Sequence, residues 1–153
     1  MPYDVTLLGA TGFAGRLTAE YLAAHAPSGL RWSIAGRNPA TLESLQSELS
    51  ELGSTPDVVR VDITDQASVR AAAEQTKVLA STVGPYIEHG EAAVAACAES
   101  GADYCDLTGE SEFVDRMWLS YDALARRTGA RLVHACGFDS VPYALGAFYT
   151  VAR

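Results

Sequence analysis

The chain has 153 residues, of which 48% are hydrophobic and 20% are charged, and its formal net charge is −8. This balance predicts one globular domain with a buried core and excludes a disordered chain. The acidic charge argues against non-specific nucleic-acid binding, which requires lysine and arginine side chains to neutralise phosphates.

Neither a secretory signal nor a membrane span is expected from the sequence. The first residues lack a basic stretch followed by an apolar run, and no apolar run approaches the ~18 residues that cross a bilayer. We therefore expect a cytoplasmic protein. The three cysteines have neither the spacing of a zinc site nor the count of a disulfide framework, so we expect reduced, buried thiols and no metal. They are Cys97, Cys105 and Cys136.

Strand-like and helix-like segments alternate along the whole chain. Strands are expected over residues 3–8, 30–35, 57–63, 77–83, 103–107 and 131–136. Helices are expected over residues 14–25, 39–52, 66–75, 88–99, 112–127 and from 141 onward. Asn38 followed by Pro39 is a strong helix start, Thr64 or Asp65 is expected to cap the third helix, and Ser111 the fifth. The core stripe of that fifth helix is expected to be Phe113, Met117, Trp118, Tyr121 and Leu124.

This alternation with short connections predicts an α/β fold of the doubly wound, Rossmann kind. We expect a mostly parallel, six-stranded sheet in the order 3-2-1-4-5-6, with helices on both faces. Such sheets bind ligands at the carboxyl ends of their strands, near the switch point between the first and fourth strands.

A glycine-rich loop follows the first strand and opens into the first helix. The unpaired N–H groups and partial positive charge of a helix N-terminus can hold a pyrophosphate, and glycine lets the phosphate approach the backbone. The alternative is a turn that needs glycine only for its geometry. No Gly-Lys-Ser/Thr follows, which disfavours nucleotide triphosphate hydrolysis. The residues expected to bind a nicotinamide dinucleotide here are Gly9, Thr11, Gly12, Phe13, Ala14 and Gly15.

The end of the second strand favours NADP(H) over NAD(H). An NAD-binding fold has an acidic residue here that binds the ribose 2′-hydroxyl, whereas this chain has Arg37 and Asn38. A guanidinium can pair with a 2′-phosphate through two hydrogen bonds. The alternative is an ordinary solvated arginine.

Two further strand ends complete the predicted cofactor site. Asp62 is placed to accept a hydrogen bond from the adenine amino group or, alternatively, to act as a helix cap or loop acid. Val83 ends the fourth strand, Gly84 and Pro85 follow it, and Gly84 would allow close approach of the cofactor. Tyr86 is a weak catalytic candidate, able to stack near the nicotinamide or donate a proton; its alternative is a structural aromatic.

Polar residues also crowd the ends of the fifth and sixth strands, at 106–110 and 136–142. Cys136 has no Cys–His arrangement to support a nucleophilic role, and His134 is expected to be a packed core residue. Asp139 and Ser140 are expected to cap the last helix. His25 and His89 are expected on helix surfaces or starts, without the spacing of metal ligands.

Five stretches, taken in order, resemble one known family. GATGFAG, AGRN, TVGPY, GADYCDLTGE and ACGFDSVP are similar to the saccharopine dehydrogenase-like oxidoreductases, and within them to the trans-acting enoyl reductases of mycobacterial and actinobacterial lipid synthesis. The resemblance implies an N-terminal Rossmann domain that binds NADPH and serves hydride transfer to the β-carbon of an enoyl thioester. The matched cofactor positions are the Gly9–Gly15 loop, Arg37 with Asn38, and the Val83–Tyr86 loop.

Members of that family are longer and carry an α+β substrate domain after the CGFDSVP stretch. We therefore expect residues 1–153 to form the NAD(P)-binding domain alone, to be inactive without the substrate domain, and to self-associate through the uncovered strand ends. Two alternatives stay open: a saccharopine-type dehydrogenase acting on an amino acid conjugate, and a dinucleotide-binding module without catalysis.

Overall fold

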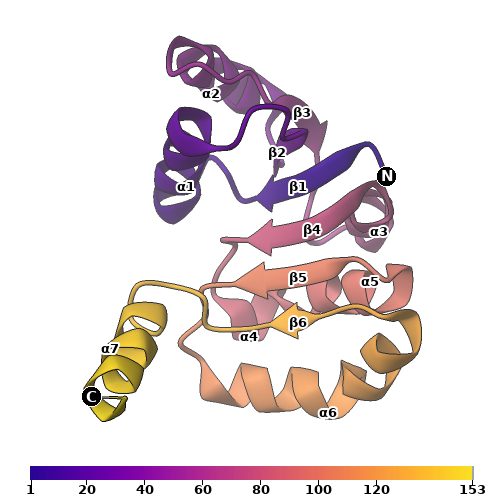
Figure 1. Ribbon diagram of the computed structural model, residues 1–153. Helices are drawn as coiled ribbons and strands as arrows, with labels where there is room; N and C mark the ends of the chain where they lie inside the picture. The colour runs from indigo at the N-terminus through magenta and orange to yellow at the C-terminus, as the bar shows by residue number, and fades with distance from the viewer. Residues whose placement is uncertain (153) are drawn as a thin grey trace.

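A six-stranded parallel sheet forms the centre of the protein in the computed structural model, which describes residues 1–152 (Figure 1). Its order is β3-β2-β1-β4-β5-β6, which confirms the predicted Rossmann arrangement. The strands are β1 (Tyr3–Leu8), β2 (Trp32–Gly36), β3 (Asp57–Arg60), β4 (Thr76–Ser81), β5 (Asp103–Asp106) and β6 (Leu132–Val133).

Helices cover both faces of this sheet. The helices of the described residues are α1 (Phe13–His25), α2 (Pro39–Glu51), α3 (Gln66–Gln75), α4 (Tyr86–His89), α5 (Glu91–Ser100), α6 (Ser111–Thr128) and α7 (Val141–Val151). Helices α1 and α2 pack on one face, in a core that includes Leu7, Ile34 and Leu42. Helices α3, α5 and α6 pack on the other, around Leu79 and Phe113. The two cores lock the strand ends into fixed positions, which is what a site at those ends requires.

Local side-chain bonds fix where several helices begin. The Asn38 carboxamide oxygen accepts hydrogen bonds from the N–H groups of Ala40 (3.1 Å) and Thr41 (3.5 Å), as predicted. Asp65 caps α3 through the Ala67 N–H at 3.1 Å. The prediction for Ser111 is wrong, because Ser111 is the first residue of α6 and Glu110 holds the cap position without a side-chain cap bond.

The sixth strand is much shorter than predicted. It ends at Val133, because the Asp106 carboxylate accepts the Ala135 N–H at 3.0 Å and Ala135 takes a left-handed φ of 57°. A residue in that conformation cannot continue a strand. The helix expected over 88–99 is divided at Gly90 into α4 and α5.

Two expectations about burial are wrong. Trp118 of α6 is 61% exposed rather than part of the core, because the buried positions Phe113 and Met117 are four apart and Trp118 lies one residue, about 100° of turn, further round the helix. Cys136 is exposed, whereas Cys97 is buried as expected.

Helix α7 lies apart from the rest of the fold. It projects from the carboxyl edge of the sheet (Figure 1), and all of its residues are exposed, aromatic ones such as Tyr143 and Phe148 among them. Ser140 precedes it without a side-chain cap bond, so the predicted capping role is not seen. Within residues 1–152, the helices are all too short or too polar to traverse a bilayer.

Candidate functional site

A cleft of about 340 Å³ opens at the carboxyl ends of β1 to β4, at the predicted switch point. Loops from both halves of the sheet contribute to it. Its walls are formed by Leu8, Gly9, Thr11, Gly12, Gly36, Arg37, Val61, Ile63, Thr64, Thr82, Val83, Gly84 and His89. A larger hollow of about 610 Å³ lies between α6 and the edge strand β6, but none of the glycine-loop residues lines it.

Two glycines of the first loop are required by the fold itself. Gly9 has a φ of +85°, and a Cβ there would lie 2.8 Å from both Thr82 Oγ1 and Val83 Cγ2. A Cβ on Gly15 would overlap the carbonyl of Gly9. Any side chain at either position would push the loop away from the end of β4.

Gly12 differs from these two. A Cβ there would have the Gly9 carbonyl as its nearest neighbour, at an ordinary 3.4 Å, and the residue is exposed at the cleft. It is also the cap residue of α1, where no side-chain hydrogen bond satisfies the helix end and no acidic residue occupies the first turn. This helix end therefore presents unpaired N–H groups and partial positive charge to the cleft, which suits a phosphate.

Arg37 lies in the same cleft, directly after β2. Among residues 1–152, no carboxylate lies within 4.0 Å of its guanidinium, although most arginines of the chain are paired. Its hydrogen-bond donors are thus available to an incoming anion. Asn38 is occupied with capping α2 and holds the turn in which Arg37 lies.

Asp62 orders the loop between β3 and α3. Its Oδ1 accepts hydrogen bonds from the N–H of Thr64 at 3.0 Å and from the Thr64 hydroxyl at 2.8 Å. These bonds, helped by the charges of Arg37 and Arg60, hold the pKa of Asp62 below its ordinary value. Its neighbours Val61, Ile63 and Thr64 line the cleft but Asp62 does not, which supports the alternative of a loop acid.

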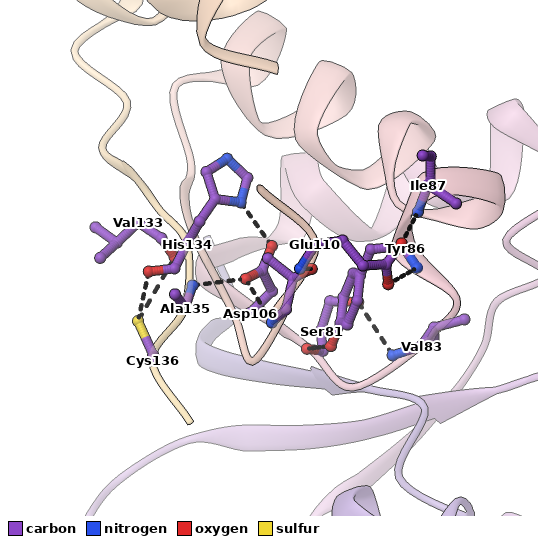
Figure 2. A network of polar contacts seen from close by, with 11 residues as sticks. Ser81, Val83, Tyr86, Ile87, Asp106, Glu110, Val133, His134, Ala135 and Cys136 are labelled. Atoms are coloured by element: carbon purple, nitrogen blue, oxygen red, sulfur yellow. Dashed lines mark hydrogen bonds and ion pairs between the residues drawn. The ribbon is translucent and has the colours of Figure 1, made fainter. Parts of the chain in front are cut away.

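The Tyr86 side chain is buried near the end of β4. Only 4% of it is exposed, and its hydroxyl donates a hydrogen bond to the Ser81 carbonyl at 2.9 Å (Figure 2). Burial raises the pKa of this phenol to about 12. Neither Tyr86 nor Pro85 lines the cleft, whereas Val83 and Gly84 do. The phenol therefore lies away from the place where the sequence suggested stacking or proton donation.

Glu110 holds the loop before Tyr86 in place, a role that the sequence did not suggest. Its two carboxylate oxygens accept the backbone N–H groups of Tyr86 at 2.9 Å and Ile87 at 2.8 Å (Figure 2). These N–H groups lie in the first turn of α4 and have no partner within that helix. Glu110, which follows β5, therefore caps a helix whose first residue is 24 positions earlier in the chain.

Asp106 and His134 join the ends of β5 and β6. The Asp106 side chain is fully buried and the His134 side chain only 10% exposed, and Asp106 Oδ2 lies 2.7 Å from His134 Nδ1. The other oxygen of Asp106 accepts the N–H group of Ala135 (Figure 2) and that of Thr108. Burial would raise the pKa of Asp106, but the bonds from His134 and Thr108 outweigh it and leave the pKa below its ordinary value.

The parallel pairing of β5 and β6 in the structure brings this pair together. Tyr104 pairs with Leu132 and Cys105 with Val133, so the next residues along the two strands are Asp106 and His134. His134 packs against the Tyr104 and Phe113 rings, but it lies just after β6 and not within a strand, and it is only partly buried.

The cysteines do not form a nucleophilic site. Burial raises the pKa of all three thiols, to about 12 at Cys97 and about 11 at Cys105. Thiols with raised pKa values are poor nucleophiles near neutral pH. Within residues 1–152, no group of histidine, cysteine and acidic side chains could hold a metal ion.

Residues 5–134 match the family model described as the saccharopine dehydrogenase NADP binding domain. The chain belongs to this family. The match confirms the predicted preference for NADP(H), and it covers both the glycine loop and Arg37. It also agrees with the resemblance seen in the sequence motifs.

Curated relatives and solved structures extend this assignment. The chain is 44% identical to a putative trans-acting enoyl reductase of Mycobacterium tuberculosis over 153 residues, and 40% identical to a trans-acting enoyl reductase of Mycobacterium ulcerans over 151 residues. Each alignment covers 99% of this chain and 36% of the relative, so the chain spans about a third of the length of these proteins.

Among solved structures, part of the saccharopine dehydrogenase (L-Glu forming) of Saccharomyces cerevisiae has the same fold as this chain. The TM-score is 0.79 at 18% identity, and the likeness covers 98% of this chain and 31% of that one. A binary complex of leucoanthocyanidin reductase and NADPH from Vitis vinifera gives a TM-score of 0.57 at 21% identity, covering 85% and 48% of the two chains. Both likenesses concern the fold alone.

Proposed function

We propose that this chain is the NADP(H)-binding part of a trans-acting enoyl reductase, which reduces an enoyl thioester in lipid synthesis. One observation carries the cofactor side of the proposal: a single cleft combines an uncapped helix N-terminus behind an open glycine with an arginine free of carboxylate partners. The names of relatives that are 40–44% identical across the chain support the substrate side.

The residues of the cleft fit a dinucleotide phosphate. The open space at Gly12 and the N–H groups at the start of α1 would hold the pyrophosphate. Arg37 would pair with the 2′-phosphate, and no ion pair within 4.0 Å among residues 1–152 would have to break first. The apolar side chains of Ile63 and Val83 would contact the faces of the adenosine and exclude water there.

When bound, NADPH supplies the hydride that passes to the β-carbon of the enoyl thioester, and a proton is added at the α-carbon. The contribution of this chain is to fix the cofactor at the strand ends. Glu110 and the Asp106–His134 pair support that task by holding the loops after β4, β5 and β6. We assign no residue of this chain to proton transfer, because the phenol of Tyr86 is buried.

Substrate binding is proposed to reside in the part of the relatives that this chain does not span. We therefore expect residues 1–153 to bind NADPH in the cytoplasm without turning it over, because nothing in the described fold closes the cleft against water. The exposed apolar residues of α7 and Phe138 support self-association of this part.

The assignment is tested first by binding. Calorimetric titration of the chain with NADPH and NADH should show tighter binding of NADPH, and Arg37→Ala should weaken NADPH about 10- to 100-fold while leaving NADH unchanged. Arg60→Ala is the matched control, since Arg60 ends β3 near Asp62 but lies outside the cleft. Unchanged NADPH affinity in Arg37→Ala would show that this arginine is merely solvated.

An assay of NADPH consumption distinguishes the enoyl reductase from its two alternatives. A protein of the relatives' full length, assayed with an enoyl thioester and with an amino acid conjugate, should consume NADPH only with the thioester. Consumption with the conjugate would favour the saccharopine-type alternative, and consumption with neither would favour a non-catalytic module.

A further inference from the structure

His89 is the one histidine of the chain that lines the cofactor cleft. The other two are engaged elsewhere: His25, at the end of α1, bonds to the Tyr21 carbonyl and stacks on the Tyr21 ring, and His134 bonds to Asp106. Neither the glycine loop nor the end of β2 contains His89, so nothing in the cofactor motifs accounts for it.

The helix that carries His89 is held on several sides. Glu110 caps its start, and Arg116 donates a hydrogen bond to the Ile87 carbonyl at 2.9 Å. At its end, Gly90 lies so close to Phe113 that a Cβ there would overlap the ring. These contacts fix the position of α4, and His89 is the residue of this helix that lines the cleft.

The residues that line the cleft lead into helices on opposite faces of the sheet. The glycine loop leads to α1 and Arg37 leads to α2, both on one face. The residues 63–64 lead to α3, and His89 leads to α5, both on the opposite face. With the pyrophosphate at α1 and the 2′-phosphate at Arg37, both phosphates lie on the first side.

The adenine ring is attached to the same ribose as the 2′-phosphate and must extend away from these charged groups. The remaining walls of the cleft are Ile63, Thr64, Val83 and His89. No residue of β5 or β6 lines this cleft, so it belongs to the adenosine half of the cofactor and not to the nicotinamide half.

The imidazole of His89 has unused binding capacity. Its side chain is 40% exposed, and among residues 1–152 the one carboxylate within 4.0 Å of it is that of the adjacent Glu88, at 3.8 Å. A neutral imidazole offers a flat aromatic face, one hydrogen-bond donor and one acceptor. Adenine presents the complementary set: a π-face, an amino donor and ring-nitrogen acceptors.

We infer that His89 contacts the adenine ring of NADP(H) and contributes to affinity, but not to the choice between NADPH and NADH. This role rests on the cofactor binding proposed above. It makes His89 a binding residue for the adenosine portion, separate from Arg37, which reads the 2′-phosphate.

The test uses fragments of the cofactor on the intact 153-residue chain. His89→Ala should weaken 2′,5′-ADP and NADPH by the same factor, about tenfold, the scale of lost base–aromatic contact. The ratio of NADPH to NADH affinity should stay at its wild-type value, whereas Arg37→Ala should lower that ratio. His25→Ala, which changes a histidine outside the cleft, should leave all affinities unchanged.

Three results would overturn the inference. Unchanged 2′,5′-ADP affinity in His89→Ala would exclude adenosine contact, loss of NADPH affinity alone would place His89 at the nicotinamide, and a lowered NADPH-to-NADH ratio would place it at the 2′-phosphate. If that variant does not fold, His89→Gln and the wild-type imidazole NMR signals answer the same question, since 2′,5′-ADP should shift the His89 signals and leave those of His25 in place. Failure of the wild type to bind NADPH would instead contradict the proposed function.

Discussion

The two halves of the sheet end in very different ways. At the carboxyl ends of β1 to β4, polar groups are left without hydrogen-bond partners among residues 1–152. The start of α1 has no side-chain cap, no carboxylate lies within 4.0 Å of Arg37, and the His89 ring makes no hydrogen bond. At the ends of β5 and β6, polar groups bind one another, with Asp106 accepting from three residues.

This difference distinguishes a binding surface from an internal brace. Groups meant for a ligand must stay unsatisfied and near solvent, whereas buried polar groups must be satisfied by the protein because an unpaired one is costly. Substitution of the mutually bonded polar groups in the β5–β6 half should therefore lower stability, and substitution of the unpaired groups in the β1–β4 half should lower cofactor affinity.

The largest effect is expected at Asp106. Asp106→Ala removes the partner of His134 and leaves the N–H groups of Thr108 and Ala135 without their acceptor. Breaking a buried pair in this way should lower the free energy of unfolding by about 3–5 kcal/mol. Urea unfolding measures this loss.

Asp122→Ala is the control for that measurement, because Asp122 forms an exposed ion pair with Arg126 one helical turn away. Such a pair is worth well under about 1 kcal/mol. Equal losses in the two variants would mean that the β5–β6 brace contributes no more than a surface contact.

The glycine loop, residues 9–15, contains both a glycine that the fold requires and a glycine that leaves space for a ligand. Gly9→Ala places a Cβ at positive φ against Thr82 and Val83, and should lower the free energy of unfolding by more than about 2 kcal/mol. Gly12 has an extended φ of −77°, so Gly12→Ala should unfold like the wild type. Its added methyl group should nevertheless weaken NADPH binding about tenfold or more, because it fills the space that the pyrophosphate needs.

Thermal unfolding and NADPH titration of both variants measure these effects. If Gly12→Ala lost as much stability as Gly9→Ala, the open space at Gly12 would serve the fold rather than a ligand.

The smallest effect is a dependence on pH. The folded pKa of Asp106 lies below the ordinary value of about 3.9 that it has in the unfolded chain, so its contribution to stability is present above about pH 4. As the pH falls through the folded pKa, protonation should remove that contribution. Urea unfolding between about pH 6 and pH 3 should show a steeper acid loss for the wild type than for Asp106→Asn. Equal slopes would contradict the lowered pKa.

The same two halves differ in how far sequence could predict them. The sheet order, the glycine loop and Arg37 followed from local patterns, because a strand, a turn and a helix start are each encoded within a few consecutive residues. Glu110 with Tyr86, and Asp106 with His134, depend on residues 24 and 28 positions apart that only the sheet brings together. The sequence contains His89, but whether its side chain reaches the cleft depends on how the fold positions α4.

Tyr86 shows the same limit. Its place after a strand end predicted a cleft residue, yet the turn into α4 carries its ring beneath β4. The early end of β6 likewise depends on a carboxylate from another strand.

The unequal glycines of the first loop bear on how such domains change over evolutionary time. The fold itself excludes side chains at Gly9 and Gly15, whereas at Gly12 only the proposed cofactor would exclude one. A lineage that no longer needed redox chemistry could replace Gly12 first and retain an intact sheet. The residue at position 12 is thus a better marker of retained cofactor use in related sequences than the shape of the domain.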